Sequence, residues 1–503
     1  MLVGNPVHVY TLIQRLTTSL GQLRLEMSNV PEVAGIERGI TQILRHGEYP
    51  DGQDMEGVTQ SVSRVMFTYK LDPLDLANGK IYGKQTEARL SPVDMFNIAI
   101  RRNSGQYPLR PGLSREFAVS IEWAEAALAA AEASTDQNKH LIDAINNFLD
   151  QVRADHDKYW QAPGSNPGNL PNEEYFIRKI RDGATAASGR QLREEESDLD
   201  DNLDISKPGY YIREYNALCR GEQVKRNGSR KRQNICLLVS NKDDYYILAP
   251  FKMEIVSSDP VLFMFHDVLT EKEMEVMKTR VASQLSVGEI QDTSVVTGGG
   301  AKVTNERTQS NAWIWDHMEP IMHKLSLKTG VMSGLITAKK VLELIPGQPI
   351  PVVESEAWQI GIYGPGGHYL PHYDSFEIPD PTSSTHTGLW VGNRIATVMF
   401  YLSHVLGGST AFPQLGLATR ATRGSAVFWF NLDHDGSRDD LSLHGACPTA
   451  LGIKWVSNKW IREGAQIWTR PCHVPRDSET SQQKFCDTAM CDIAANVTSN
   501  KHL

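Results

Sequence analysis

The first part of the chain carries its hydrophobic residues at helical spacing. In residues 5–27 apolar side chains recur close to the 3.6-residue period of an α-helix. Residues 114–134 are rich in alanine after Ser114, a residue type that caps helix N-termini, and residues 138–160 form another amphipathic stretch. We therefore predict an all-helical region that extends to about residue 182.

Two of these predicted helices, 114–134 and 138–158, could be the units of a helical repeat. No second sharp copy of a repeat follows, so the pairing is the only repeat signal. Residues 183–208 hold seven acidic side chains between Glu194 and Asp204 and few large apolar groups. That composition predicts a solvated linker rather than a binding tail.

From about residue 258 the pattern changes to short apolar runs separated by Gly, Pro, Asn and Asp. Four of these runs read as strands: 358–363, 394–403, 425–432 and 454–461. Two amphipathic stretches, 270–285 and 317–330, predict helices before the strands. The last large domain is therefore expected to be mainly antiparallel β, a sandwich or barrel with packing helices.

Bulk properties exclude some partners. The 503-residue chain has a net charge of −9 and a pI of about 5.9, so its electrostatics give no support for nucleic-acid binding. No stretch approaches 18 apolar residues, so we expect no membrane span. The first 20 residues lack a clean signal peptide and read as an amphipathic helix.

Candidate chemistry begins with His372 and Asp374, which follow the glycine-rich turn "YGPGG". In an extended chain residues i and i+2 point to the same face, so both side chains could reach one ion. With His444 they would form the two-histidine, one-carboxylate set that suits iron(II) oxygenases, because it leaves coordination positions open. Structural zinc wants four protein ligands, and Cys447, three residues from His444, keeps that alternative open on spacing alone.

Lys454 favours iron over zinc. It lies ten residues after His444, and Pro448 and Gly452 between them suit a turn, so both side chains could share the inner face of one hairpin. A lysine that points into a β-lined pocket needs an anionic partner, because an unpaired buried charge is costly. A dicarboxylate co-substrate would chelate the metal with one end and meet Lys454 with the other.

Several motifs then carry a family resemblance. "YGPGGHYLPHYD", "GNRIATVMFYLSHVLGGSTAFP", "GSAVFWFNL" and "HGACPTALGIKWVSNKWIRE" resemble the catalytic domain of the collagen prolyl 4-hydroxylase α subunit over about 258–473. "GNPVHVYTLIQRL" is similar to the family's N-terminal dimerisation region. Residues 90–182 match its tetratricopeptide-like peptide-binding domain loosely.

The resemblance implies a multidomain α + β chain, with an N-terminal all-α region followed by a C-terminal double-stranded β-helix, or jelly roll. The expected parts are a helical dimerisation region (1–88), a tetratricopeptide-like peptide-binding domain (89–182), an acidic linker and disulfide-containing connector (183–257), the dioxygenase domain (258–473) and a tail (474–503). The implied activity hydroxylates proline in X-Pro-Gly repeats of procollagen to 4-hydroxyproline and decarboxylates 2-oxoglutarate to succinate. Fe(2+) and L-ascorbate would be cofactors, and dioxygen the second co-substrate.

The resemblance also implies roles for individual residues. His372, Asp374 and His444 would bind iron(II), and Lys454 would hold the C5 carboxylate of 2-oxoglutarate. Tyr363 would hydrogen-bond the co-substrate, Thr410 and Trp460 would line its pocket, and Arg394 would lie toward the peptide. The alternative for Tyr363, Thr410 and Trp460 is strand packing, and Arg394 suits a surface strand end equally well.

The family match further implies disulfides Cys219–Cys236 and Cys447–Cys472, against the alternative of six free thiols. Sequons at Asn227 and Asn496 are candidate glycosylation sites, and Cys486 and Cys491 have no assigned role. The implied setting is the endoplasmic reticulum lumen, in an α2β2 or αβ assembly with protein disulfide isomerase. Because that setting conflicts with the lack of a signal peptide, we expect an incomplete N-terminus. Two alternatives are a hydroxylase of another protein's proline or lysine, and a non-catalytic collagen-binding subunit.

Overall fold

The computed structural model describes a defined part of the chain. It covers residues 4–19, 50–104, 117–134, 138–160, 211–224, 235–288 except 242, 307–337, 354–376 and 392–466, with shorter stretches at 290–291, 301–302, 341–345 and 348–351 and single residues 22, 26 and 470. These fall into two compact units. The helical unit is residues 1–213 with 364–367 and 448–452, and the β unit is the remainder. Predictions for Asn227, Asn496, Cys472, Cys486, Cys491 and the linker 183–208 lie outside the described residues.

The helical unit confirms the predicted helices within its described residues. Its helices are α1 (Pro6–Gln14), which continues into a π-helical turn η1 (Arg15–Ser19), then α4 (Gly52–Thr68), α5 (Pro73–Ala77), α6 (Pro92–Asn103), α7 (Phe117–Ala133) and α8 (Lys139–Trp160). A two-stranded ribbon joins β1 (Lys80–Ile81) to β2 (Lys84–Gln85). Asp51 and Ser91 form capping boxes at the starts of α4 and α6.

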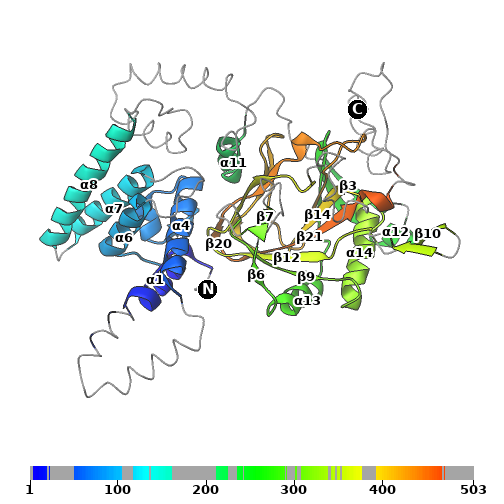
Figure 1. Ribbon diagram of the computed structural model, residues 1–503, viewed down its shortest axis with the longest axis horizontal. Helices are drawn as coiled ribbons and strands as arrows, with labels where there is room; N and C mark the ends of the chain where they lie inside the picture. The colour runs from blue at the N-terminus through cyan, green and yellow to red at the C-terminus, as the bar shows by residue number, and fades with distance from the viewer. Residues whose placement is uncertain are drawn as a thin grey trace. The chain divides into compact units, whose positions relative to one another are not determined.

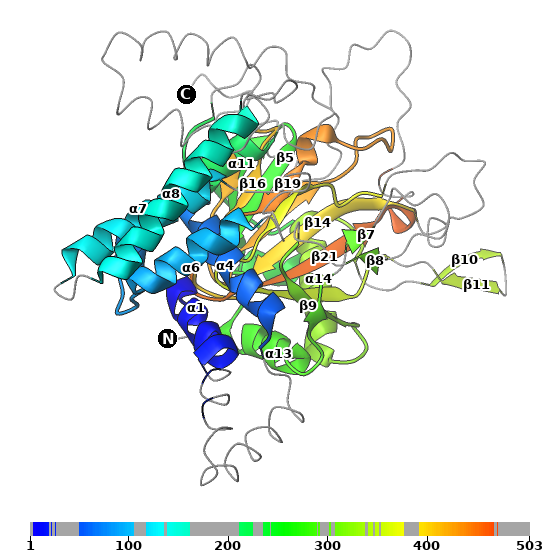
Figure 2. The same cartoon turned by 60° about the vertical axis from the view of Figure 1, so that its left-hand side comes forward.

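Helices α6, α7 and α8 lie side by side (Figure 2). Phe96 of α6 meets Phe148 of α8 edge-to-face, with ring centroids 5.4 Å apart, and Trp123 of α7 is fully buried. The aromatic residues therefore hold the helices together. The tetratricopeptide assignment for this region stays a prediction. None of the described helices combines the length and hydropathy that crossing a membrane requires.

The β unit is built on two antiparallel sheets. The larger has the order β3-β4-β5-β18-β14-β21-β12-β9-β6, and the smaller has the order β13-β19-β16-β17. The bounds in the larger sheet are β3 Ile235–Val239, β4 Phe251–Ser258, β5 Val261–His266, β18 Ala426–Phe430, β14 Arg394–Tyr401, β21 Lys454–Arg462, β12 Trp358–Tyr363, β9 Ser310–Ile314 and β6 Ser286–Val287. Those in the smaller sheet are β13 Tyr369–His372, β19 His444–Ala446, β16 Thr410–Phe412 and β17 Leu417–Thr419.

The remaining elements are short or cover the sheets. The helices are α11 (Ile212–Cys219), α12 (Asp244–Leu248), α13 (Glu271–Val281) and α14 (Pro320–Ser333), with 3₁₀ turns η5 (Asp440–Ser442) and η6 (Glu463–Ala465). Further short strands are β7 (Ile290–Gln291), β8 (Ala301–Lys302), β10 (Val341–Ile345), β11 (Gln348–Pro351), β15 (Leu406–Gly407) and β20 (Thr449–Leu451). The two long helices confirm those predicted at 270–285 and 317–330.

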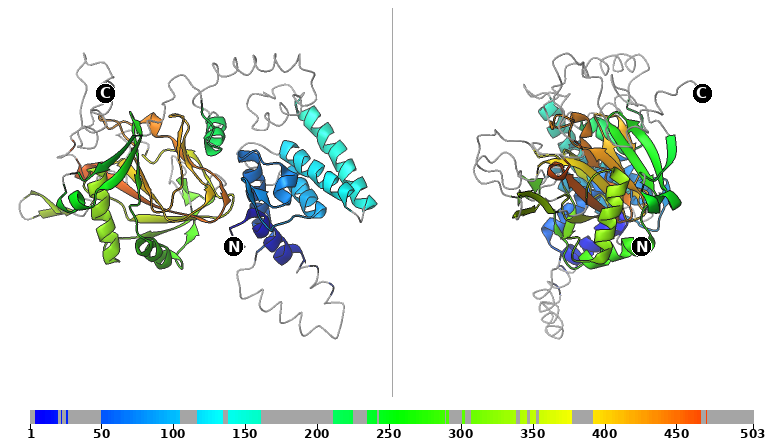
Figure 3. Two further views of the ribbon diagram at one scale, coloured as in Figure 1. Left: turned by 180° about the vertical axis from the view of Figure 1, so that it is seen from behind. Right: turned by 90° about the vertical axis from the view of Figure 1, so that its right-hand side faces the viewer.

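Both faces of the larger sheet are buried, which explains why its central strands read as continuous apolar runs. On β14, Phe400 points into the cluster that contains Met277 of α13 and Leu325 of α14, on the face that these helices cover (Figures 1 and 3). Met399 and Tyr401 point the other way, into a second cluster with residues of the smaller sheet. The arrangement is consistent with the predicted jelly roll, and the candidate site lies on this inner face.

The larger sheet begins earlier than the sequence indicated. Strands β3 and β4 lie within the predicted connector 183–257, yet they pair with β5 as part of the sheet. Strand β3 is an apolar run like the central strands, but it is an edge strand that exposes Cys236 and Leu238.

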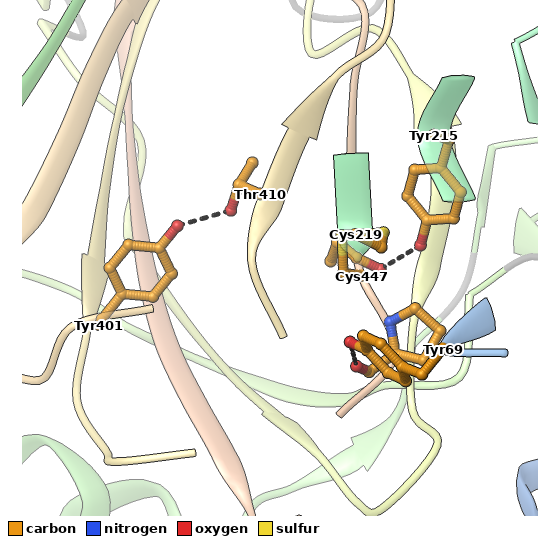
Figure 4. The surroundings of a disulfide bond; sticks show 8 residues. Tyr69, Tyr215, Cys219, Tyr401, Thr410 and Cys447 are labelled. Atoms are coloured by element: carbon orange, nitrogen blue, oxygen red, sulfur yellow. Dashed lines mark hydrogen bonds between the residues drawn. A yellow bond between two sulfur atoms is a disulfide. The ribbon is translucent and has the colours of Figure 1, made fainter. Parts of the chain in front are cut away.

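The disulfide pairing differs from the predicted one. Cys219, the last residue of α11, is bonded to Cys447, which follows β19 (Figure 4). Cys236 is exposed and forms no disulfide with another described residue. Both Cys219–Cys236 and Cys447–Cys472 are therefore corrected. The reason is that α11 packs on the smaller sheet: Tyr215 Oη donates to the carbonyl of Ala446 at 2.6 Å, which brings the next turn of the helix to Cys447.

This pairing can be tested by peptide mapping without reduction. We expect a cross-linked pair of peptides that contain Cys219 and Cys447, and an alkylated Cys236. Replacing Cys219 with serine should lower the stability of the β unit by about 2–5 kcal/mol, because the bond closes a long loop. A peptide that links Cys219 to Cys236 would contradict the structure.

Candidate metal centre

Three side chains of the smaller sheet converge inside the β unit. His372 at the end of β13 lies opposite His444 at the start of β19 in the antiparallel register, and Asp374 follows two residues later. One ligand atom from each residue lies within 4.8 Å of the others. His372 Nε2 is 3.8 Å from Asp374 Oδ1, and His444 Nε2 is 3.7 Å from Asp374 Oδ2. The predicted triad is therefore brought together.

Backbone carbonyls orient both imidazoles. His372 Nδ1 lies 2.8 Å from the carbonyl oxygen of Leu370, and His444 Nδ1 lies 2.9 Å from that of Ser442. A carbonyl only accepts, so each Nδ1 carries the proton and each Nε2 has a free lone pair. Such a second hydrogen bond is typical of histidines that ligate metals. Both Nε2 atoms face Asp374 and are available for one ion.

The electrostatics favour the protonation states that a metal needs. Burial, with a smaller contribution from His444, lowers the pKa of His372 to about 3, so its ring is neutral at physiological pH. Burial raises the pKa of Asp374, but His444, His372 and Arg394 together lower it by more, so its pKa lies below the usual value. A neutral imidazole beside an ionised carboxylate is a set of electron-pair donors for a divalent cation.

The only such cluster found among the described residues has three donors. Cys447, which kept a zinc alternative open, is bonded to Cys219 and has no thiolate to offer. Two imidazoles and one carboxylate leave coordination positions open, as non-haem iron(II) oxygenases require.

Lys454 occupies the inner face of the larger sheet. It is 1% exposed, and its Nζ has no hydrogen-bond partner among the described residues. The ammonium lies 5.2 Å from the centroid of the Tyr363 ring and 5.7 Å from that of Tyr401. Burial lowers its pKa to about 7. A buried ammonium that is surrounded by neutral rings is costly by itself. It could form an ion pair with the carboxylate of a ligand.

One prediction about Lys454 was wrong in its geometry. His444 and Lys454 do not share the face of one hairpin, because β19 belongs to the smaller sheet and β21 to the larger. The two side chains instead belong to the two sheets of the β unit. Sequence spacing could not distinguish a hairpin from a crossing between sheets.

The other predicted residues lie around these groups. Tyr363 pairs with Lys454 across β12 and β21, and burial raises the pKa of its phenol. Thr410 is buried, with its Oγ1 2.7 Å from Tyr401 Oη (Figure 4). Tyr401 was missed because its sequence context, an aromatic residue within an apolar run, carries no chemical signal.

Arg394 is tied to the site rather than free at a strand end. Its guanidinium donates to both carboxylate oxygens of Glu356, at 2.6 and 2.8 Å, and lies 3.7 Å from the centroid of the Trp460 ring. Its Nη1 also donates to the backbone carbonyl of Asp374 at 3.3 Å. Glu356, which no sequence pattern marked, pairs with both Arg394 and Arg462 at this border of the metal centre.

Comparison with known proteins defines the class first. Residues 358–462 match the model of the 2OG-Fe(II) oxygenase superfamily, and this range contains the triad and Lys454. Residues 1–83 match the model of the prolyl 4-hydroxylase alpha-subunit N-terminal region. The superfamily match implies Fe(2+) and 2-oxoglutarate, and the three donors and the unpaired buried lysine fit both groups.

Full-length relatives then define the family. Prolyl 4-hydroxylase subunit alpha-2 of Caenorhabditis elegans is 31% identical over 497 residues, which cover 96% of this chain and 84% of that protein. Subunit alpha-1 is 28% identical in both Rattus norvegicus and Homo sapiens, over 93% of this chain and 84% of each relative. The chain belongs to the family of prolyl 4-hydroxylase alpha subunits, and it is a prolyl hydroxylase of the 2OG-Fe(II) oxygenase superfamily.

Two buried lysines of β21 provide a matched test of whether the ammonium of Lys454 destabilises the fold. Lys454 has no hydrogen-bond partner within the described ranges, whereas Lys459, equally buried, donates to Asp316 at 3.0 Å and to the carbonyl of Glu356 at 2.7 Å. We expect Lys454→Met to raise the unfolding free energy by on the order of 1–4 kcal/mol. We expect Lys459→Met to lower it by about 1–3 kcal/mol, because it removes the partner of Asp316.

The effect of Lys454→Met should also depend on pH. The pKa of Lys454 is about 7 in the folded protein and 10.5 without the fold, so the unfolded state binds more protons between these values. The advantage of the variant is therefore full below pH 7 and shrinks as the pH rises toward 10.5. Denaturant unfolding of both variants across this range is the measurement. A loss of stability in Lys454→Met would show that the ammonium already has a partner.

Proposed function

We propose that this chain is the catalytic alpha subunit of a procollagen-proline 4-dioxygenase. The enzyme would convert proline in X-Pro-Gly repeats to 4-hydroxyproline while it decarboxylates 2-oxoglutarate to succinate. The observation that carries the proposal is that one β unit, in a chain of this family, holds three candidate metal ligands and a buried lysine without a hydrogen-bond partner among the residues that the structure describes.

The ligand groups have assigned places in this proposal. His372 Nε2, His444 Nε2 and Asp374 would hold iron(II), which supplies the dioxygen activation that an unreactive C–H bond needs. Lys454 Nζ would bind the C5 carboxylate of 2-oxoglutarate and so orient its other end toward the metal. An ammonium–carboxylate contact in a buried site is strong, since water does not compete with it.

Neutral phenols support this anchor. Burial raises the pKa of Tyr363, and it raises that of Tyr401 to about 12, so both hydroxyls remain protonated. Tyr363 would donate a hydrogen bond to the co-substrate. Thr410 and Trp460 would complete the pocket wall, the first through its contact with Tyr401 and the second beside Arg394.

Arg394 would lie toward the peptide. It is paired with Glu356, which also pairs with Arg462, so it would act through its position and remaining N–H groups rather than as a free cation. A fixed planar guanidinium stacked on an indole loses little freedom when a peptide carbonyl binds to it.

The setting of the enzyme is part of the proposal. As an alpha subunit, the chain would assemble with protein disulfide isomerase as the beta subunit, in an α2β2 or αβ complex, and L-ascorbate would maintain the iron(II) state. The endoplasmic reticulum lumen is the proposed location. The disulfide between Cys219 and Cys447 supports it, because such bonds persist in oxidising compartments.

The activity can be tested with the full chain co-expressed with protein disulfide isomerase. Iron(II), 2-oxoglutarate, ascorbate and a repeating Pro-Pro-Gly peptide would be supplied, and the peptide read by tandem mass spectrometry. We expect one added oxygen on the proline before glycine, and none with His372→Ala. Succinate without peptide oxidation would leave an oxygenase of another proline or lysine target. Neither product from a folded, iron-loaded complex would favour the collagen-binding alternative.

The anchor role of Lys454 predicts a separate binding result. In the presence of a divalent metal, 2-oxoglutarate should raise the thermal midpoint of the wild-type protein and of Lys459→Met, but not that of Lys454→Met. An equal shift in all three proteins would refute the role of Lys454 and leave the metal centre untouched. Differential scanning fluorimetry at several ligand concentrations provides the measurement.

A further inference from the structure

We propose that Thr397 and Asn431 form a relay that positions the carboxylate of Asp374 for metal binding. Thr397 Oγ1 donates to Asp374 Oδ2 at 2.7 Å, and Asn431 Nδ2 donates to Thr397 Oγ1 at 2.9 Å. Thr397 and Asn431 are fully buried. The inference rests on the proposed metal site and assigns two positioning residues beyond it.

The relay is held by the backbone of the larger sheet. Thr397 lies on β14, opposite Trp429 of β18, and Asn431 directly follows β18. The backbone N–H of Asn431 donates to the carbonyl of Ile395 at 2.8 Å, so it extends the ladder past the end of the strand. The side chains of Thr397 and Asn431 therefore start from fixed positions, and the relay connects the larger sheet to the carboxylate.

The direction of the relay follows from the available protons. An amide nitrogen only donates and an ionised carboxylate only accepts, while the threonine hydroxyl has one proton. Because Asn431 Nδ2 donates to Thr397, the threonine proton points to Asp374. If the amide of Asn431 were turned around, its oxygen and the carboxylate of Asp374 would both need the single hydroxyl proton of Thr397. The polarity therefore runs from Asn431 through Thr397 to Asp374, and it favours the ionised carboxylate.

The consequence is a choice between the two carboxylate oxygens. Oδ2 accepts the hydroxyl of Thr397, whereas Oδ1, which lies 3.8 Å from His372 Nε2, does not receive this hydrogen bond. Arg394 fixes the same residue from its other side, through the backbone carbonyl of Asp374. The relay thus favours coordination through one oxygen, which keeps positions free for the co-substrates.

The pair is poorly explained as packing. A buried hydroxyl and a buried amide cost desolvation free energy that hydrogen bonds must offset, and Asn431 Oδ1 has no hydrogen-bond partner among the described residues. Valine has nearly the shape of threonine and would fill the same space. Residues that orient metal ligands typically change metal affinity about 10–100-fold when removed.

Cobalt(II) is the probe for the test, because its d–d absorption reports the ligand field without turnover. The protein is the full chain co-expressed with protein disulfide isomerase. We expect Thr397→Val to weaken Co(II) binding at least about tenfold and to change the absorption, and Thr397→Ser to remain within about threefold of wild type. Asn431→Leu should weaken binding less, and it should add little in the background of Thr397→Val, since it acts through that hydroxyl.

Thr419→Val is the matched control. Thr419 is also a fully buried strand threonine, but its hydroxyl lies 3.1 Å from Tyr401 Oη and contacts no proposed ligand. We expect the Co(II) affinity of this variant to equal that of wild type. Thermal melts of all variants show whether each protein is folded.

The outcomes separate the relay from the metal site itself. A folded wild-type complex that binds no Co(II) would remove the metal site, and the relay with it. Wild-type affinity and absorption in Thr397→Val would overturn the relay alone. Equal losses of affinity in Thr397→Val, Thr397→Ser and Thr419→Val would mean a packing effect and would also overturn it.

Discussion

The site depends on one strand pairing, between β13 and β19 of the smaller sheet. It sets His372 opposite His444, and the bend that follows β13 brings Asp374 within reach of both. The outer side of this pairing is equally constrained. A Cβ on Gly445 would lie 2.8 Å from the Tyr215 ring and 3.0 Å from the Tyr369 carbonyl, so α11 packs against bare backbone. The bond between α11 and the end of β19 fixes the strand that carries one of the histidines.

The larger sheet contributes what the smaller one cannot, a buried positive charge. Its strand β21 carries Lys454 on the inner face and Lys459 on the helix-covered face, five residues apart. The structure satisfies the second with Asp316 and a backbone carbonyl and leaves the first without a partner among the described residues. A partner for Lys454 like that of Lys459 would make the fold more stable. A buried charge without such a partner is typical of a ligand site, where part of the folding stability is lost in favour of binding.

The sequence indicated the parts of the molecule that local patterns determine. Central strands such as β12 and β14 were predictable because both of their faces are apolar, and the triad because His372 and Asp374 are neighbours in the chain. Relations between distant segments were not. Spacing suggested a hairpin for Lys454, and the family resemblance implied local disulfides, whereas sheet topology decided both. Thr397 lies within an apolar run, and its link to Asp374 is visible only when β14 is folded against the loop after β13.

The two halves of the site are prepared to different degrees. In the metal half every donor already has an orienting contact from the chain: a carbonyl for each imidazole and a hydroxyl for the carboxylate. These contacts cost little to keep when an ion arrives, because no side chain has to reorganise. In the co-substrate half the chain supplies neutral rings and an ammonium whose pKa falls toward neutrality. An anion that binds there favours the charged form of Lys454, and the charged form in turn binds the anion. The co-substrate half is therefore complete only when its ligand is present.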